Sequence, residues 1–189
     1  MAAEADTRKL VLLGPPGSGK GTQAERIAKE LDVPHISTGD MLREAVEEGT
    51  ELGRRVESIM NSGALVDDDT MAEVVRERLA RDDAREGFIL DGYPRTLPQA
   101  ETLDSILSAS GGGVEAVVLI DVPEDELVRR SLARQRADDT EKVIRERQRV
   151  YREKTEPLIG HYRAKGLLEE VDGDASIEEV TSRIVEVVG

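Results

Sequence analysis

The sequence predicts an α/β protein in which helices cover both faces of a five-stranded parallel sheet, a three-layer α/β/α sandwich. Short apolar runs alternate along the chain with amphipathic helical patterns, which is the arrangement of βαβ units. The first apolar run also ends in a glycine-rich turn that leads into a helix, as at the carboxyl edge of a parallel sheet. A chain of 189 residues is expected to form one domain with a real core.

Each element follows from its local pattern. Five short apolar segments are predicted as strands: Lys9–Leu13, Pro34–Ser37, Gly87–Leu90, Ala116–Asp121 and Leu167–Val171. Eight segments have helical periodicity: Lys20–Leu31, Gly39–Glu48, Leu52–Asn61, Asp68–Arg81, Leu97–Ser108, Glu124–Arg134, Thr140–Lys165 and Ser176–Val187. The region 49–69 contains no strand, and glycines flank its helical pieces. It is therefore predicted to be an inserted helical flap.

Composition narrows the functional class. The net charge of −14 argues against a general nucleic-acid or anionic-membrane binder. No run reaches the ~18 apolar residues of a membrane span, and the acidic segment Met1–Thr7 lacks the apolar stretch of a signal peptide. The absence of cysteine excludes disulfides and thiolate zinc sites. We therefore expect a cytoplasmic protein that meets any polyanionic ligand with a local concentration of positive charge.

The segment Leu10–Thr22 is the strongest functional motif. It reads LVLLGPPGSGKGT, so glycines at 14, 17 and 19 precede a lysine at the start of a helix. Glycines let the backbone wrap closely and point N–H groups at an anion, and the lysine can reach phosphate oxygens. Here Gly21 stands between Lys20 and the hydroxyl of Thr22, unlike the general phosphate-loop pattern. The alternative is a glycine-rich turn without a ligand, but the flanking strand and helix favour a phosphate loop.

Asp91 follows the third predicted strand. A carboxylate at that edge can hold Mg²⁺, usually through water, opposite a phosphate loop. The alternative is an aspartate that only caps a turn, and its place beside the phosphate loop favours the metal.

A second strand-to-helix junction, Ser37–Arg43, adds a hydroxyl and a cation. Ser37 or Thr38 would cap the helix in any protein. Capping does not explain Arg43, which lies about one turn into the helix near an anion-attracting N-terminus.

Arginines gather in the segment 129–136, which holds four of them in an otherwise acidic chain. Such a cluster is ordinarily a solvated face paired with nearby acids. Two helices antiparallel about Asp138–Asp139 would instead bring Arg134, Arg136 and the later Arg147 to one cleft. The two aspartates are expected to cap the second helix and to orient the guanidinium groups.

These features together predict phosphoryl transfer. They comprise a phosphate loop, one candidate metal-binding aspartate, up to five arginines (43, 95, 134, 136 and 147) and no evident nucleophile. His35 and His161 are isolated and receive no catalytic role. Phosphoryl transfer depends mainly on positioning and charge neutralisation. So many arginines beside a loop, a lysine and a metal predict a second phosphorylated substrate.

From about Lys9 to its C-terminus, the chain resembles the adenylate kinase family of nucleoside monophosphate kinases. The resemblance is carried by GPPGSGKGTQ, STGDMLR, LDGYPRTLPQ and RADDT, and Gly21-Thr22 matches that family. It implies Mg²⁺-dependent transfer from ATP to AMP, with Gly17, Ser18, Gly19, Lys20, Gly21 and Thr22 on the ATP phosphates, Arg134 clamping them, and Ala175 at the base. It implies an AMP site of Thr38, Arg43, Ala64, Leu65, Val66, Gly92, Tyr93, Pro94, Arg95, Gln99, Arg136 and Arg147, with Asp91 on the metal.

The resemblance also implies an organisation around that site. A core of residues 8–36 and 67–189 would carry an AMP-binding flap at 37–66 and a minimal lid at about 133–139. Many bacterial members separate the two lid arginines by about thirty residues and sometimes bind zinc there, whereas here only Gln135 separates them. The resemblance is thus to the short-lid form, which leaves the turn 135–139 to shield the γ-phosphate from water. A monomer that binds ATP and AMP, and no zinc, nucleic acid or membrane, is expected.

Three alternatives stay open on the sequence alone. A UMP or CMP kinase shares the scaffold, although Thr38 and Thr96 stand where those relatives usually have Ala and Asn. A nucleotide-binding module without turnover is disfavoured by the presence of Asp91, Arg95 and the lid arginines. A kinase for a small sugar-like acid is disfavoured by the motif around Thr38.

Overall fold

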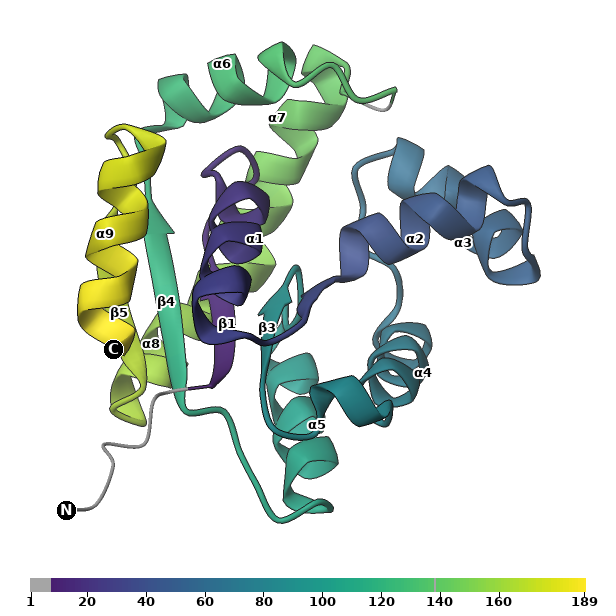
Figure 1. Cartoon of the computed structure of the whole chain (residues 1–189). Helices are drawn as coiled ribbons and strands as arrows, with labels where there is room; N and C mark the ends of the chain where they lie inside the picture. The colour runs from purple at the N-terminus through teal and green to yellow at the C-terminus, as the bar shows by residue number, and fades with distance from the viewer. Residues whose placement is uncertain (1–7, 138) are drawn as a thin grey trace, which may run out of the picture.

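The predicted fold class is confirmed in a computed structural model, which describes residues 8–137 and 139–189. All strands pair in parallel in the order β2-β3-β1-β4-β5 (Figure 1). Their bounds are β1 Lys9–Leu13, β2 His35–Ser37, β3 Phe88–Asp91, β4 Ala116–Asp121 and β5 Leu168–Asp172. Each lies within one residue of its predicted segment.

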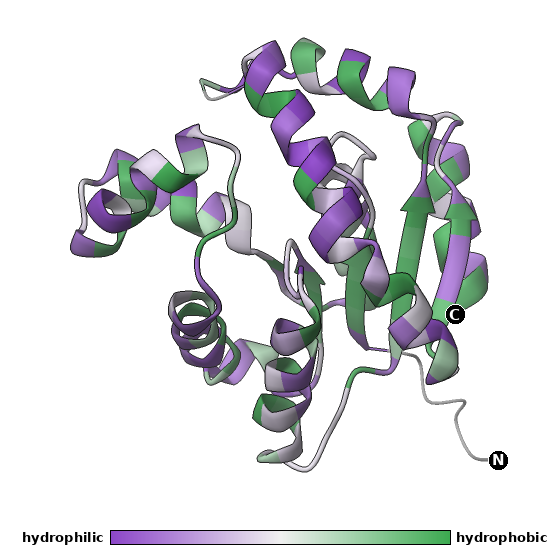
Figure 2. Cartoon of the chain, turned by 180° about the vertical axis from the view of Figure 1, so that it is seen from behind, coloured by the Kyte–Doolittle hydropathy of each residue, from purple (hydrophilic) through white to green (hydrophobic). Residues whose placement is uncertain are grey.

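The sheet is buried on both faces. Successive residues of a strand point to opposite faces, so Leu10 and Leu12 pack into one core cluster while Val11 and Leu13 pack into another. The first cluster lies under α1 (Lys20–Leu31) and α9 (Ile177–Val188), and the second includes residues of α5 (Leu97–Ser108), α8 (Pro157–Ala164) and α4 (Asp68–Leu79). The central strands are accordingly almost uniformly hydrophobic (Figure 2).

A helical pair projects from this sandwich beside the β2 edge. It consists of α2 (Thr38–Glu47) and α3 (Glu51–Asn61), which stand apart from the sheet in Figure 1. Gly53 permits their close approach, because a Cβ there would lie 2.0 Å from the Ala45 carbonyl oxygen. The region 49–69 thus contains α3 and the start of α4 and no strand, and α3 packs against α2.

Two more helices, α6 (Glu124–Ala133) and α7 (Glu141–Val150), lie over the carboxyl ends of the strands (Figure 1). No helix in the described part of the chain is long and apolar enough to cross a membrane.

The single helix predicted over 140–165 is wrong in one respect. After α7 the chain makes a π-helical turn, Tyr151–Thr155, before α8 begins at Pro157. Proline has no N–H and its ring crowds the carbonyl four residues back. The preceding turn therefore widens, and Glu156 N donates to Tyr151 O at 2.8 Å. A short 3₁₀ turn, Asp82–Ala84, was also not predicted.

Candidate active site

The loop between β1 and α1 forms a cradle because two of its glycines adopt left-handed backbone conformations. Gly17 and Gly19 have φ values of 87° and 93°. A Cβ on Gly17 would lie 2.6 Å from both the Leu127 carbonyl oxygen and the Ser131 Oγ. Helix α1 begins at Lys20, immediately after the loop, and the first N–H groups of a helix lack intrahelical partners. The local structure is thus suited to an anion.

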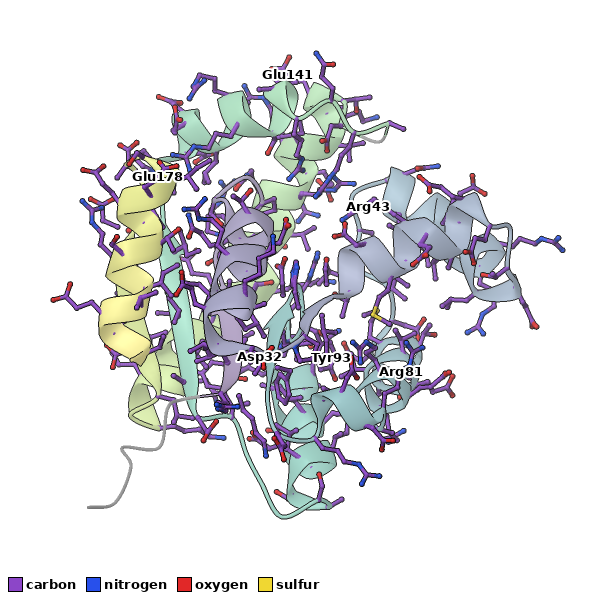
Figure 3. The ribbon with its side chains drawn as sticks, in the orientation of Figure 1. Asp32, Arg43, Arg81, Tyr93, Glu141 and Glu178 are labelled. Carbon is purple, nitrogen blue, oxygen red and sulfur yellow. The ribbon has the colours of Figure 1, made fainter. Side chains whose placement is uncertain are left out.

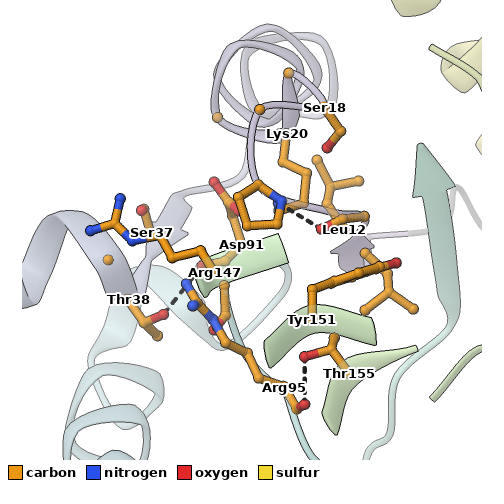
Figure 4. Close-up of a pocket in the computed structure, with 18 of the residues that line it drawn as sticks. Leu12, Ser18, Lys20, Ser37, Thr38, Asp91, Arg95, Arg147, Tyr151 and Thr155 are labelled. Carbon is orange, nitrogen blue, oxygen red and sulfur yellow. Dashed lines mark hydrogen bonds between the residues drawn. The ribbon is translucent and has the colours of Figure 1, made fainter. Parts of the chain in front are cut away.

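The side chain of Lys20 folds back into this cradle. Its Nζ donates to the Gly14 carbonyl oxygen at 2.8 Å (Figure 4) and to the Pro15 carbonyl oxygen at 3.2 Å. Burial lowers the pKa of Lys20 to about 8; Asp91 opposes this shift and nearby arginines reinforce it. A phosphate group beside the ammonium would favour its charged form.

Asp91 lies at the carboxyl end of β3 and is 8% exposed. Burial raises the pKa of Asp91, but a hydrogen bond with His35 and the charge of Lys20 outweigh it, so the net pKa lies below the ordinary value. His35 Nε2 is 3.4 Å from Asp91 Oδ2. Because an ionised carboxylate can only accept, Nε2 carries the hydrogen in this contact.

The ionised carboxylate of Asp91 is the type of ligand that Mg²⁺ prefers. Within residues 8–137 and 139–189, no group of three or more His, Cys, Asp or Glu side chains could hold a metal ion alone. A Mg²⁺ ion at Asp91 would therefore need phosphate oxygens and water as its other ligands.

The N-terminus of α2 is capped by Ser37, whose Oγ accepts from Asp40 N at 3.2 Å. Thr38 therefore does not cap this helix. It is buried and donates to the Asp91 carbonyl oxygen at 3.5 Å (Figure 4). Arg43 lies on the inner side of the flap (Figure 3), with NH2 2.5 Å from Asp40 Oδ1. The second strand-to-helix junction thus faces the same site as the phosphate loop.

Asp139 joins the three arginines at positions 134, 136 and 147. Its side chain is fully buried, and its oxygens accept from Arg134 Nε at 2.7 Å and Arg147 NH1 at 2.9 Å. The backbone N–H of Arg136 also donates to it, at 3.3 Å. Burial raises the pKa of Asp139, but hydrogen bonding and charge from Arg134 lower it further than burial raises it. The predicted juxtaposition of these three arginines is therefore present.

The predicted capping role of the aspartates is wrong for Asp139. The N-cap of α7 is Thr140, whose Oγ1 accepts from Val143 N at 3.3 Å. Asp139 cannot serve as a cap because both of its oxygens face arginines. Asp138 lies outside the described residues.

Arg95 is held from three directions. Its Nε donates to the Gly92 carbonyl at 2.8 Å, its backbone N–H donates to Gln99 Oε1 at 2.7 Å, and its carbonyl accepts from Thr155 Oγ1 at 2.8 Å. Burial lowers the pKa of Arg95, Asp91 partly offsets this, and Arg147 and other arginines lower it further. The positive charges of Arg43, Arg136 and Arg147 near Arg95 repel one another, so a bound anion would stabilise the site.

One cavity of about 670 Å³ connects these groups. Its lining contains every predicted site residue except one: Gly17, Ser18, Gly19, Lys20, Gly21, Thr22, Thr38, Arg43, Ala64, Leu65, Val66, Asp91, Gly92, Pro94, Arg95, Gln99, Arg134, Arg136, Arg147 and Ala175. The exception is Tyr93, whose side chain is 1% exposed within the core cluster beneath the flap (Figure 3).

The structure also brings in residues that the sequence analysis did not assign. His35 contacts Asp91, Thr155 supports Arg95, and Gln148 Nε2 donates to the Pro16 carbonyl at 2.7 Å. Arg130 joins the phosphate loop to the segment after β5, donating to the carbonyls of Ser18 at 3.4 Å and Gly173 at 3.1 Å. His35 and Arg130 had sequence signals, since His35 lies on a strand two residues before Ser37 and Arg130 belongs to the arginine-rich segment 129–136.

Comparisons with known proteins agree with this geometry. A family model described as "Adenylate kinase" matches residues 12–167. The chain is 53% identical over 184 residues to a Thermus thermophilus protein named adenylate kinase, covering 95% of this chain and 96% of that protein. It is 50% identical over 181 residues to an adenylate kinase of Nocardia farcinica, covering 96% and 99%.

A third relative differs in length. The adenylate kinase of Archaeoglobus fulgidus is 45% identical over 206 aligned residues, covering 93% of this chain and 95% of that protein. Since this chain has only 189 residues, that relative contains residues that have no counterpart here.

Proposed function

The chain belongs to the adenylate kinase family, and from that premise we propose how its residues carry out reversible transfer of the terminal phosphoryl group of ATP to AMP, giving two ADP. It is a nucleoside monophosphate kinase. The observation that carries the residue assignment is the convergence of a phosphate loop, an ionised aspartate and all five predicted arginines on one cavity.

ATP binds through the phosphate loop in this proposal. The segment Gly17–Thr22 holds its phosphates through backbone N–H groups other than that of Ser18, which donates to the Pro15 carbonyl oxygen. The Lys20 ammonium binds the same phosphates, and Arg134 reaches them from the opposite wall. The base lies against the backbone at Ala175, beside the Arg130–Gly173 contact. The left-handed glycines and the lowered pKa of Lys20 support this assignment.

AMP binds between the flap and the core. Thr38 and the backbone of Ala64–Val66 contact the nucleoside, together with Gln99, while Arg43, Arg95, Arg136 and Arg147 neutralise the phosphate. Their common presence in the cavity lining supports this arrangement. Tyr93 contributes to the packing beneath the site rather than a side-chain contact.

In the transfer step, an AMP phosphate oxygen attacks the γ-phosphorus of ATP while the bond from that phosphorus to the β-phosphate oxygen breaks. Negative charge spreads over the transferring group, and Lys20, Arg95 and Arg147 face it and stabilise it. Mg²⁺, held beside Asp91 through water, supplies further charge neutralisation when it is bound with ATP. The ionised carboxylate in the cavity wall fits that role. Zinc has no part in the proposal, since the chain has no cysteine.

We assign the core to residues 8–36 and 67–189, the AMP-binding flap to 37–66 and the minimal lid to about 133–139. The separate packing of α2 and α3 supports the flap. Action as a cytoplasmic monomer on free nucleotides is part of the same proposal. The acidic net charge supports action on free nucleotides rather than nucleic acid, and the absence of cysteine fits a reducing compartment.

The proposal is tested by offering AMP, UMP, CMP and GMP in parallel with Mg-ATP and quantifying all nucleotides after separation. We expect rapid phosphorylation of AMP alone, with little ADP in the control without acceptor. Preferred transfer to UMP or CMP would contradict the role of Thr38, and no transfer to any acceptor would contradict kinase activity.

A further inference from the structure

The tip of the phosphate loop is a β-turn formed by Pro15–Ser18. Ser18 N donates to the Pro15 carbonyl oxygen at 3.1 Å. Pro16 occupies the second position, and Gly17 occupies the third with a φ of 87°. Proline followed by glycine with φ near +80° defines a type II turn.

The central peptide of such a turn has two orientations. A rotation of about 180° converts type II into type I and reverses the directions of the Pro16 C=O and the Gly17 N–H, because the two groups are antiparallel in a planar trans peptide. Glycine at the third position tolerates either form. In a phosphate-binding loop, the direction of each N–H decides whether it can face the ligand.

A buried side chain from α7 fixes this peptide. Gln148 is 3% exposed, and its Nε2 donates to the Pro16 carbonyl oxygen at 2.7 Å. It lies behind the cavity wall rather than in it, since it is absent from the lining residues that the structure describes. Figure 1 shows α7 passing behind α1 and its preceding loop.

The opposite side of the turn is closed by α6. The Leu127 carbonyl oxygen and the Ser131 Oγ lie 2.6 Å from the position that a Cβ on Gly17 would take. The turn is therefore in contact with α6 through Gly17 and with α7 through Pro16, and the hydrogen bond from α7 selects its orientation.

We propose that Gln148 is a positioning residue for ATP. It holds the Pro16–Gly17 peptide in the type II orientation before nucleotide arrives. The inference rests on the proposed function, because it takes ATP phosphates as the ligand of this loop. Burying an amide without a hydrogen bond costs free energy. Gln148 makes such a bond to the Pro16 carbonyl, which an apolar residue of similar size could not make.

Three variants test this role. Q148L keeps the volume and removes the donor. Q148E restores a donor only when its carboxyl group is protonated, because the ionised form repels the Pro16 carbonyl. I144V is the matched control: Ile144 is 1% exposed on the same helix and outside the cavity, so this variant reduces packing without touching the turn.

Affinities for ATP and AMP are measured separately by titration calorimetry, together with KM for each and the melting temperature. We expect Q148L to raise the Kd for ATP about fivefold, the factor that the net contribution of one hydrogen bond represents. Its Kd for AMP should stay within about twofold, as should both constants of I144V. The ratio of the Q148E to the wild-type Kd for ATP should fall as the pH is lowered from 8 to about 5.5.

An unchanged ATP affinity in Q148L would overturn the inference. So would an equal loss of affinity for ATP and AMP, or a Q148E ratio that does not vary with pH. If the wild type binds ATP but transfers nothing to AMP, the proposed function fails, while the calorimetric comparison of Q148L with the wild type still decides the role of Gln148.

Discussion

The phosphate loop and the arginine cluster face the same cavity, but they hold their positive charge in different ways. In the loop, backbone carbonyls are the partners: Lys20 Nζ donates to those of Gly14 and Pro15, and Gln148 donates to that of Pro16 in the adjacent turn. Among the arginines that line the cavity, acidic side chains hold Arg134 and Arg147 through Asp139 and Arg43 through Asp40. Arg95 is held by the Gly92 carbonyl instead.

This difference separates two tasks. In the proposed function the loop binds ATP, and its glycine conformations are already formed, so we expect little rearrangement there. Arg43, Arg134 and Arg147 are bonded to carboxylates, so we expect them to release or share those partners when nucleotide phosphates bind. We therefore expect changes in the loop to affect ATP binding and changes among the arginines to affect transfer.

The sharpest way to separate the two regions is Arg95→Ala. Because one well-placed arginine contributes about 10³–10⁵ in rate, we expect kcat to fall by about 10³ or more while the Kd for ATP changes little. Turnover and calorimetric ATP binding measure the two effects. Arg54→Ala, an exposed arginine of α3 outside the cavity, is the matched control. A comparable loss of ATP affinity in R95A would contradict the separation of ATP binding from phosphoryl transfer.

The next largest effect is expected at Asp139, the acid that is bonded to Arg134 and Arg147. Asp139→Asn removes the charge between Arg134 and Arg147, and we expect the free energy of unfolding to fall by about 2 kcal/mol, as for the loss of hydrogen bonds to charged groups. Urea unfolding measures this, with Glu141→Gln as an exposed control on α7. ATP and AMP together should restore more stability to D139N than to the wild type, because phosphates resupply negative charge.

The pH dependence of that pair has a defined sign. The pKa of Asp139 in the folded chain lies below its ordinary value of 3.8. Its contribution to stability is therefore present above pH 4 and is lost as the pH falls through the folded pKa. The stability difference between wild type and D139N should shrink below about pH 4. If the stability difference between wild type and D139N stays the same below about pH 4, the shape rather than the charge of Asp139 would account for it.

A smaller effect tests the loop by pH. Because the pKa of Lys20 is about 8 in the free protein, we expect kcat/KM for ATP to fall about tenfold between pH 7 and pH 9 as the ammonium is lost. The unfolded chain binds more protons at this lysine over that range, so the contribution of Lys20 to stability rises with pH. Deprotonation of Lys20 therefore does not itself destabilise the fold over that range. The KM for AMP is the internal control. A kcat/KM for ATP that does not change between pH 7 and pH 9 would contradict the lowered pKa of Lys20.

The smallest expected effect separates the contribution of the α7 N-cap to stability from that of the charge on the neighbouring Asp139. Thr140→Ala removes the N-cap of α7, and we expect a loss of about 1 kcal/mol in unfolding free energy. Thermal denaturation measures it, and the transfer rate should stay close to that of the wild type. A loss as large as that of D139N would mean that α7 and the arginines cannot be treated separately.

The sheet and most helices were predictable because their signals are local. Strand β4 and helix α5 begin and end where apolar runs and turn residues place them. The break at Tyr151–Thr155 was not predicted, because the periodicity continues through it and only Pro157 marks the widened turn.

The site was predictable where its chemistry lies in short motifs. The phosphate loop, the Ser37–Arg43 junction and the Asp91–Arg95 segment all follow strands, so topology brings them together. The support of Pro16 by Gln148 and of Arg95 by Thr155 was not predictable. These bonds join a side chain to a distant carbonyl, and no residue type or spacing marks them. Tyr93 lies inside a site motif, but its side chain packs into the core.

The central claim is that the loop and the arginines together transfer a phosphoryl group to AMP rather than to water, although the lid is short. The most direct measurement is the stoichiometry of the reaction with Mg-ATP and excess AMP, following ATP, ADP and inorganic phosphate over time. We predict two ADP formed for each ATP consumed, with little inorganic phosphate. One ADP and one phosphate for each ATP would contradict that claim.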